Sequence, residues 1–429
     1  MKYAPISSHL FIKNRKKFAD LLLNDSLAIF NSNDIYPISA DSTLPFKQHT
    51  DIFYLSGIDQ EESVLLIHKD AQGKISEALF VKETNEHIAI WEGHKLTQAE
   101  AQKISGINQV YWLSEFDAQL KQYVSESKNL YINTNEHARN SAVTQTREDR
   151  FIKKIQSEYP NHIYQKSNPL LHQIRSVKEP EEIELIQHAC NITEKGFRRV
   201  LSFIKPDVWE YEIEAEFIHE FIKNRSKGFA YTPIIASGKN ANILHYIENN
   251  QKCNTGDLLL LDVAAEYANY SSDMTRTIPV SGRFTPRQKE VYQSVLRIKN
   301  EATRMLKPGL LFKDYNTNIG ELMTGELIQL GLLDKHDLQN QTPEKPAYKK
   351  FYMHSTSHFL GLDTHDYGDN TQPMQAQMVL TVEPGIYIPE ENIGIRLEDN
   401  VVIQEKGFPI NLMKNIPIEI EEIEDLMNF

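Results

Sequence analysis

Four acidic residues stand at or near the ends of apolar segments in the C-terminal half of the chain. Asp262 follows the run LLLL, Asp273 lies eleven residues later, Glu383 follows VLTV, and Glu398 lies within IGIRLEDNVVI. An ionised carboxylate in an apolar setting costs several kcal/mol unless a partner compensates its charge. These acids therefore need a shared counter-charge.

A histidine-rich segment adds nitrogen ligands to these oxygens. The sequence YMHSTSHFLGLDTHDYG holds His354, His358 and His365. Four acids and one imidazole, His358, form a set whose charge a pair of divalent cations would compensate. Two such ions share bridging carboxylates and polarise a carbonyl, which is metal-assisted hydrolysis at neutral pH. Oxygen-rich ligands with a single histidine favour Mn²⁺, with Co²⁺, Fe²⁺ and Zn²⁺ as alternatives.

Each of these residues also has an ordinary structural role open to it. An aspartate after a strand is commonly a turn residue or a helix cap. Asp273 could be a loop acid, and Glu383 could simply end a strand before Pro384. His354 and His358 are four residues apart and could share one face of a helix. The joint occurrence of these residues between apolar flanks, within a repeat, strengthens the case for a metal site, but their spacing alone leaves both interpretations open.

The elements that would position these residues fall into two domains. A chain of 429 residues is too long for one ordinary core, and we expect an α/β domain over residues 1–172 and a second domain over residues 173–429. The first contains short elements such as FYLSGI, SVLLIH and EALFVK, with helical stretches between them. The second opens with a long helix that begins at Pro180.

A weak internal repeat organises the second domain. Two helices each end in a Lys-Pro turn, at Lys205 and at Lys307. After each turn come a second amphipathic helix, a histidine, and an apolar strand that carries an acid. These histidines and acids are His245 with Asp262, and His358 with Glu383. The repeat predicts a pseudo-twofold α+β domain with a site between its halves.

Composition narrows the class of protein. With 40% hydrophobic and 24% charged residues the chain is globular, and its net charge of -13 argues against nucleic acid or an anionic membrane as a partner. The N-terminal segment has basic residues where a signal peptide needs an apolar core, and no apolar run approaches a membrane span. We expect a cytoplasmic protein whose cysteines, Cys190 and Cys253, stay reduced.

Five segments together resemble the pita-bread metallopeptidases, and within them the aminopeptidase P branch. They are SGKNANILHY, LLDVAAEYANYSSDMTRTIPVSG, HSTSHFLGLDTHDYG, VEPGIYI and GIRLEDNVVI. In the first domain, FKQHTDIFYLSGIDQEESVLLI and IWEGHKLT are similar to the creatinase-type domain that accompanies this branch. The resemblance implies an α+β protein in which a creatinase-like α/β N-terminal domain precedes a pseudo-twofold pita-bread catalytic domain.

The resemblance also implies a role for each metal ligand. Asp262 would bind one ion, while His358 and Glu383 would bind the other. Asp273 and Glu398 would bridge the two ions. Glu383 would in addition carry a proton during hydrolysis.

Four further residues match positions that the family uses around the metal site. His245 and His365 would stabilise the tetrahedral intermediate and position the substrate. Arg396 would hold the carboxylate network or a substrate group, and His354 would lie near the substrate. Structural alternatives remain open: His245 could be a surface loop residue, His365 could pair with a neighbouring aspartate, and Arg396 could be a structural counter-charge.

The activity implied is removal of an N-terminal residue that precedes proline, by an Xaa-Pro aminopeptidase that forms a homo-oligomer, a dimer or a tetramer. Proline lacks an amide hydrogen and restricts the residue before it, so ordinary peptidases handle this bond poorly. A prolidase restricted to Xaa-Pro dipeptides would have nearly the same ligands. A non-catalytic pita-bread protein that binds a ligand or partner is a further alternative.

Overall fold

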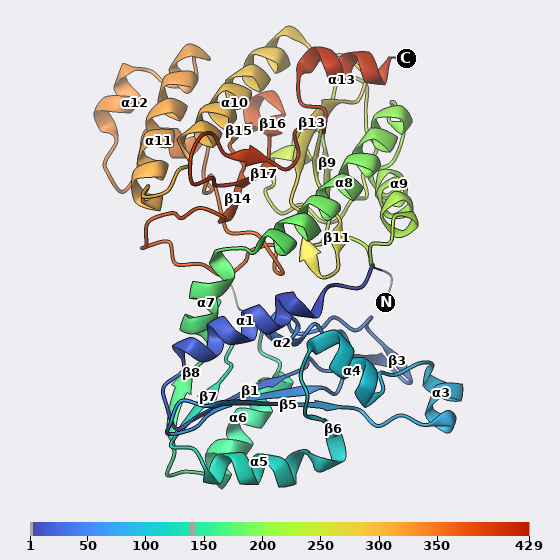
Figure 1. Cartoon of the computed structure of the whole chain (residues 1–429). Helices are drawn as coiled ribbons and strands as arrows, with labels where there is room; N and C mark the ends of the chain where they lie inside the picture. The colour runs from blue at the N-terminus through green and yellow to red at the C-terminus, as the bar shows by residue number, and fades with distance from the viewer. Residues whose placement is uncertain (1–2, 138–141, 429) are drawn as a thin grey trace. The chain divides into compact units, whose positions relative to one another are not determined.

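The computed structural model describes residues 3–137 and 142–428. Residues 1–2, 138–141 and 429 of the two predicted domains lie outside the described ranges. The chain divides into two compact units, one up to Arg175 and one from Ser176 onward. The predicted boundary, between residues 172 and 173, falls within helix α7 (Asn168–Ser176). Each unit has its own sheets and helices (Figure 1).

The first unit is built on one mixed sheet of six strands in the order β6-β5-β4-β1-β7-β8. The inner strands β1, β4 and β5 pair antiparallel, and β6, β7 and β8 join in parallel. Predicted segments SVLLIH and EALFVK correspond to β4 and β5. The strands are β1 (Ser26–Asn31), β4 (Val64–Lys69), β5 (Ile75–Val81), β6 (Val110–Trp112), β7 (Asn129–Ile132) and β8 (Ile163–Lys166), with a small hairpin of β2 (Pro37–Ser39) and β3 (Ser42–Thr43).

Helices cover both faces of this sheet, with α5 and α6 on one face and α1, α2 and α4 on the other (Figure 1). Buried Leu120 of α5 and Ile155 of α6 pack with Leu66 and Phe80 of the sheet. The segment FYLSGI lies largely in helix α2, which ends where Gly57 adopts a positive φ of 70°. The helical bounds are α1 (Ser8–Leu21), α2 (Thr50–Ser56), α3 (Glu86–Glu92), α4 (Gln98–Ser105), η1 (Leu113–Glu115), α5 (Phe116–Ser125) and α6 (Arg147–Glu158).

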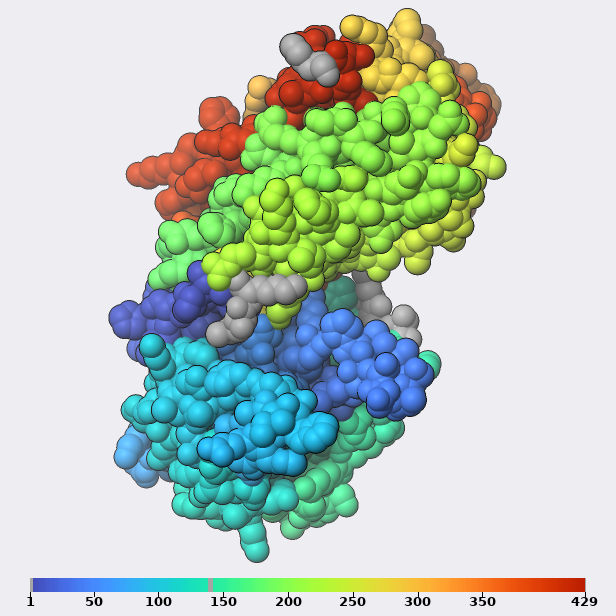
Figure 2. Space-filling view, turned by 90° about the vertical axis from the view of Figure 1, so that its right-hand side faces the viewer, coloured from blue at the N-terminus to red at the C-terminus, as the bar shows by residue number. Residues whose placement is uncertain are grey.

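Two helix pairs flank the strands of the second unit. Figure 1 shows α8 and α9 on one side and α10 and α11 on the other, and Figure 2 shows α8 and α9 forming an outer face of this unit. Helix α8 begins at Pro180 as predicted, and it buries Ile186, Ala189 and Cys190 on one side. The helices are α8 (Pro180–Phe203), α9 (Glu210–Lys223), η2 (Gly238–Asn242), α10 (Pro286–Met305), α11 (Phe312–Gln329), α12 (Lys335–Asn340), η3 (Ala347–Lys350), η4 (Pro389–Glu391) and α13 (Ile420–Met427).

The strands of the second unit form small antiparallel sheets: β13-β10-β9, β14-β17-β18, β15-β16 and β11-β12. Asp262 ends β10, and Asp399 of β17 pairs with Val382 at the end of β14, next to Glu383. The strand ends therefore bring the acids toward one region. The bounds are β9 (Ile234–Ser237), β10 (Leu258–Asp262), β11 (Glu266–Tyr267), β12 (Tyr270–Ser271), β13 (Thr275–Pro279), β14 (Val379–Val382), β15 (Gly385–Ile388), β16 (Ile393–Arg396), β17 (Asp399–Val402) and β18 (Ile410–Asn411).

No helix within the described ranges is both long enough and apolar enough to cross a membrane.

A buried carboxyl in the first unit is held by a single asparagine. The backbone N–H and the side-chain amide of Asn31 donate to the two Glu148 oxygens at 2.9 and 3.0 Å. Burial raises the pKa of Glu148 to about 8, and this effect outweighs the opposite effect of the Asn31 hydrogen bonds. The folded protein therefore holds a proton at Glu148 that the unfolded chain releases near the ordinary glutamate pKa.

This shift predicts a pH-dependent contribution to stability. Because the pKa is higher in the folded state, the unfolding free energy decreases as pH rises from about 4.5 to about 8, by about 1.4 kcal/mol per unit of pKa difference. We expect Glu148→Gln to remove this decrease, as measured by urea denaturation at several pH values in that window. Glu158→Gln, at an exposed position of the same helix, is the control. A Glu148→Gln protein with an unchanged pH profile would contradict the assignment.

Candidate metal centre

Three of the predicted metal ligands form one compact group. Asp273, His358 and Glu398 each offer a ligand atom, and these atoms all lie within 4.8 Å of one another. His358 Nε2 is 3.4 Å from Asp273 Oδ2 and 3.6 Å from Glu383 Oε1, so the fourth residue, Glu383, adjoins the group. Four residues that are far apart in the sequence thus lie close together in the structure.

The carboxylate of Asp262, the fifth predicted ligand, is held by two side chains. Tyr231 donates its hydroxyl to Oδ1 at 2.6 Å, and Arg396 donates from Nη2 to Oδ2 at 2.6 Å. Burial is the largest cause that raises the pKa of Asp262, Arg396 opposes this shift, and the negative charge of Asp273 adds to it. Tyr231 and Arg396 therefore set the orientation of the Asp262 carboxylate.

Backbone and hydroxyl contacts fix the orientation of the group. Asn400 accepts from the Asp273 backbone N–H at 3.0 Å and donates to the Asp273 carbonyl at 2.7 Å. Thr275 donates its hydroxyl to Glu398 Oε2 at 2.7 Å. The Nδ1 atom of His358 lies 2.9 Å from the carbonyl oxygen of Phe359. A hydrogen bond there places the proton on Nδ1 and leaves the Nε2 lone pair directed at the acids.

The buried acidic side chains of this group repel one another. Burial is the largest cause that raises the pKa of Asp262, Glu383 and Glu398, and repulsion from neighbouring acids adds to it. The pKa of His358 is also raised: although burial lowers it, Asp273 and Glu383 have the larger combined effect. Asp262, Glu383 and Glu398 therefore take up protons more readily than exposed acids do, unless positive charge is supplied.

The donor set fits divalent metal ions. Glu398 Oε1 is buried and has no hydrogen-bond partner among the described residues, so one ligand oxygen is available. Carboxylate oxygens with one imidazole nitrogen suit harder divalent ions, and the Nδ1 contact of His358 is the usual support for a metal-binding histidine. Asp262, Asp273, His358, Glu383 and Glu398 are the residues that could hold such ions.

His354 is a neutral imidazole next to this group. Its Nδ1 lies 2.8 Å from the Ser355 carbonyl oxygen and therefore carries the proton, while Nε2 accepts from the Tyr387 hydroxyl at 2.8 Å. Burial, followed by the charge of Arg396, lowers the pKa of His354 to about 3. Arg396 also donates from Nη1 to the Tyr387 hydroxyl at 2.8 Å.

The other two predicted histidines occupy different surroundings. The His365 ring lies against the His358 ring, with 4.1 Å between the ring centres. His245 follows η2 on the surface, where its side chain is exposed, yet its charge contributes to the low pKa of His354. Eight of the nine predicted site residues are therefore linked through side-chain contacts in one region of the second unit, whereas exposed His245 is linked to it only by its electrostatic effect on His354.

Two tyrosines and one asparagine contact the site although they were not among the predicted site residues. Tyr231 and Tyr387 bond to predicted site residues, but buried tyrosines are more often packing residues, and nothing in their spacing distinguishes them. Asn400 lies two residues after Glu398 within an apolar strand. A buried asparagine needs hydrogen-bond partners, so its position in a segment expected to be buried could have indicated a contact with the site.

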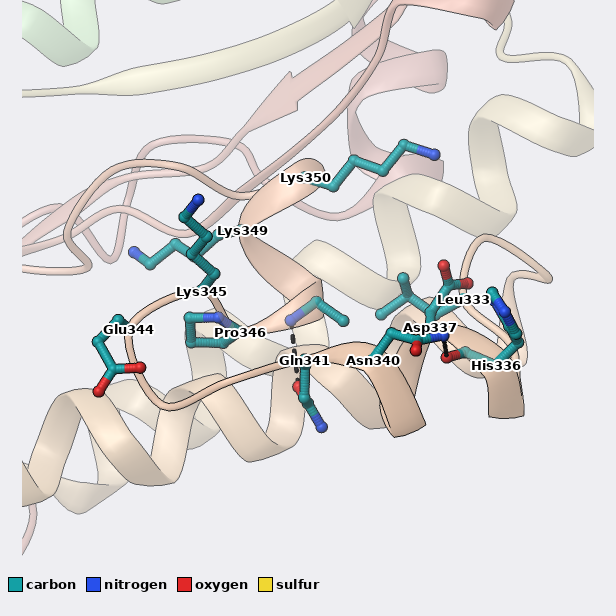
Figure 3. Close-up of a pocket in the computed structure, with 11 residues that line it drawn as sticks. Leu333, His336, Asp337, Asn340, Gln341, Glu344, Lys345, Pro346, Lys349 and Lys350 are labelled. Carbon is teal, nitrogen blue, oxygen red and sulfur yellow. Dashed lines mark hydrogen bonds between the residues drawn. The ribbon is translucent and has the colours of Figure 1, made fainter.

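A separate cavity of about 630 Å³ lies beside α12 and η3 (Figure 3). None of the predicted site residues lines it. Its lining includes side chains of both positive and negative charge, and most of them are exposed; they include Lys345, Lys350, Asp337 and Glu344. This open surface feature is distinct from the buried carboxylate group.

The fold and the buried ligand set define a metal-dependent hydrolase. The family model for metallopeptidase family M24 matches residues 184–405, and the model for the aminopeptidase P N-terminal domain matches residues 11–131. The chain belongs to metallopeptidase family M24, in the Xaa-Pro aminopeptidase (aminopeptidase P) branch. The family requires divalent metal ions, in agreement with the donor set.

Relatives are similar over nearly the whole chain. The Xaa-Pro aminopeptidase of Haemophilus influenzae is 34% identical, covering 97% of this chain and 96% of the relative. That of Escherichia coli is 33% identical, covering 98% of each. The solved structure of E. coli aminopeptidase P with the inhibitor Pro-Leu superposes with a TM-score of 0.89 at 32% identity, covering 99% of each chain. The predicted α+β fold, a creatinase-like domain followed by a pita-bread domain, is confirmed.

Loss of one central carboxylate is expected to abolish metal retention. Asp273→Asn keeps the shape of the side chain but removes a charge within the group, so the remaining ligands attract a cation less strongly. We expect the variant, after loading with Mn²⁺ and dialysis, to contain little metal by elemental analysis and to lack the thermal stabilisation that Mn²⁺ gives the wild type. Glu391→Gln, which removes a surface partner of Arg287, should behave as wild type. Wild-type metal content in Asp273→Asn would contradict this.

Removal of the Tyr231 hydroxyl is expected to weaken metal binding less severely. Tyr231→Phe deletes the hydrogen bond to Asp262 Oδ1 while keeping the ring, and loss of such support lowers metal affinity by about tenfold. Calorimetric titration of the metal-free protein with Mn²⁺ measures this change. Tyr211→Phe, at a position 51% exposed, is the matched control. Equal affinities for the Tyr231→Phe and Tyr211→Phe proteins would exclude the supporting role.

Proposed function

We propose that the protein is a dinuclear-metal aminopeptidase that removes the N-terminal residue from peptides whose second residue is proline. The observation that carries this proposal is the compact group of Asp273, His358 and Glu398 in a chain similar over its full length to Xaa-Pro aminopeptidases. A metal-dependent hydrolase needs such a group of ligands, and the similarity to Xaa-Pro aminopeptidases indicates the class of substrate.

The proposed ligands divide between two ions, with Mn²⁺ as the proposed metal. Asp262 would hold one ion, His358 and Glu383 the other, and Asp273 and Glu398 would bridge them. The proximity of His358 to Asp273 and Glu383 supports this division. The chemistry that two such ions supply when bound is polarisation of the scissile carbonyl and activation of a water molecule.

The proton required by the leaving group is assigned to Glu383. Cleavage before proline releases a secondary amine, which must gain a proton as the C–N bond breaks. Glu383 accepts a proton from the attacking water and passes it to the proline nitrogen. Its Oε2 lies 3.8 Å from His354 Nδ1, so the carboxylate faces the neighbouring candidate residues as well as His358.

Three candidates are assigned to the substrate. His365 and His245 donate hydrogen bonds to the substrate carbonyl oxygens, where negative charge develops during attack. His354, held neutral by its surroundings, contacts the peptide near the proline without adding charge. Arg396 compensates the charge of Asp262 and orients the Tyr387 hydroxyl.

The wider assignment follows the same proposal. The catalytic domain comprises residues 173–429, and the protein forms a homo-oligomer, either a dimer or a tetramer. A cytoplasmic location is supported by the two cysteines, which are buried and unpaired. The net charge of -13 supports peptides rather than nucleic acid or membranes as partners.

Hydrolysis of matched peptides tests the function. We expect the Mn²⁺-loaded protein to cut an Xaa-Pro-Xaa tripeptide, and the metal-free protein and the Asp273→Ala variant to be inactive, because each lacks activated water. Product release followed by chromatography is the measurement. An Xaa-Ala-Xaa tripeptide is the control for the proline requirement.

Two results would overturn this assignment. Cleavage of the Xaa-Pro dipeptide alone would identify a prolidase. Two bound metal ions per chain without cleavage of any proline peptide would favour a binding protein.

A further inference from the structure

A buried ion pair lies in the second unit outside the proposed metal ligands. Lys178 donates from Nζ to Asp366 Oδ2 at 2.9 Å, and both side chains are 1% exposed. Lys178 also attracts the buried carboxyl of Glu182, which accepts from the Tyr270 hydroxyl at 3.0 Å. Breaking such a pair leaves an uncompensated charge out of water, so Lys178 and Asp366 hold a fixed separation.

Asp366 ends a tightly folded segment that begins at His358. Its backbone N–H donates to the Phe359 carbonyl at 2.9 Å, which closes the segment into a loop. Gly361 lies against the ion pair: a β-carbon there would be 2.0 Å from Asp366 Oδ2 and 2.9 Å from Lys178 Cε. The loop therefore packs directly on the ion pair, with no space for a side chain at Gly361.

Lys178 is anchored at its other end to the strand that leads to Glu383. Its backbone N–H donates to the Gln377 carbonyl at 3.0 Å, and Val177 forms a β-bridge with Met378. Met378 directly precedes β14, and Glu383 directly follows that strand. Lys178 thus ties the loop to the strand leading to a proposed ligand.

The residue held by this connection is His365. It directly precedes Asp366, and its ring lies 4.1 Å from the His358 ring, centre to centre. We infer that the Lys178–Asp366 ion pair positions His365 against His358, so that His365 faces the substrate. This inference rests on the proposed function, in which His365 contacts the peptide.

Removing both charges distinguishes two possible roles of the ion pair: stabilising the fold alone, or positioning His365. Lys178→Met alone removes the positive charge that lies 2.9 Å from buried Asp366, and it is expected to lower the unfolding temperature. The double variant Lys178→Met/Asp366→Asn has no charge at either position and nearly the same shape. We expect it to regain most of the lost stability, because no unpaired charge remains at the pair.

Kinetics of the Mn²⁺-loaded double variant on an Xaa-Pro-Xaa tripeptide separate the two roles. A displaced His365 is expected to lower kcat by about tenfold or more, since small misplacements of a reacting group are costly. KM and metal content should stay near the wild-type values. Recovery of both stability and kcat in the double variant would show that the pair is only structural.

A double-mutant cycle tests whether the effect passes through His365. His365→Ala is expected to lower kcat by about 100-fold in the wild-type background. In the Lys178→Met/Asp366→Asn background the same change should have a much smaller effect, because His365 is already displaced. Equal effects of His365→Ala in the two backgrounds would overturn the inference.

A spectroscopic readout separates this inference from the proposed function. The ring-proton NMR signal of His365, assigned by comparison with His365→Ala, reports its position beside the His358 ring in the metal-free protein. We expect the signal to shift in the double variant and to be unchanged in the exposed control Lys335→Met on α12. An unshifted signal contradicts the positioning role. Failure of the wild type to cut proline peptides contradicts only the proposed function.

Discussion

Negative charge held out of water is the constraint on which the second unit depends. Asp262, Asp273, Glu383 and Glu398 converge from the ends of separate strands, and burial disfavours the charged form of the three whose pKa values are raised. Arg396 compensates one acid directly. The negative charge that Arg396 does not compensate needs a further source of positive charge. Divalent ions, which this family requires, supply it, and oxygen ligands with a single imidazole suit such ions.

The support for this charge extends behind the site. Asp399, next to Glu398, pairs with Arg276 at 2.6 Å and with Lys299, all three being buried. Arg276 also donates to the Glu398 carbonyl oxygen at 2.6 Å. These cations lower the pKa of Asp399 below its ordinary value, so it stays ionised beside the raised pKa of Glu398. The two adjacent acids therefore have different surroundings: Asp399 is paired with two cations, whereas Glu398 keeps one oxygen available.

The acids could be selected from the sequence as candidate ligands because their apolar flanking segments are visible locally, and the repeat assigned them to two halves of the domain. It did not predict that FYLSGI would lie largely in a helix, since short apolar runs are compatible with either structure. Contacts such as that of Tyr231 with Asp262 depend on which segments meet in three dimensions, and the spacing of residues along the sequence does not indicate them. The exposure of His245 likewise follows from the position of a short turn after β9.

Asn400 has a consequence for the thermodynamics of ion capture. By bonding to both the N–H and the C=O of Asp273, its amide takes the place of a neighbouring strand and removes backbone freedom at a proposed bridging residue. Conformational entropy at that residue is therefore lost during folding rather than at the moment of binding. Binding of the ion therefore requires less ordering of the chain, and its free energy is more favourable by that amount.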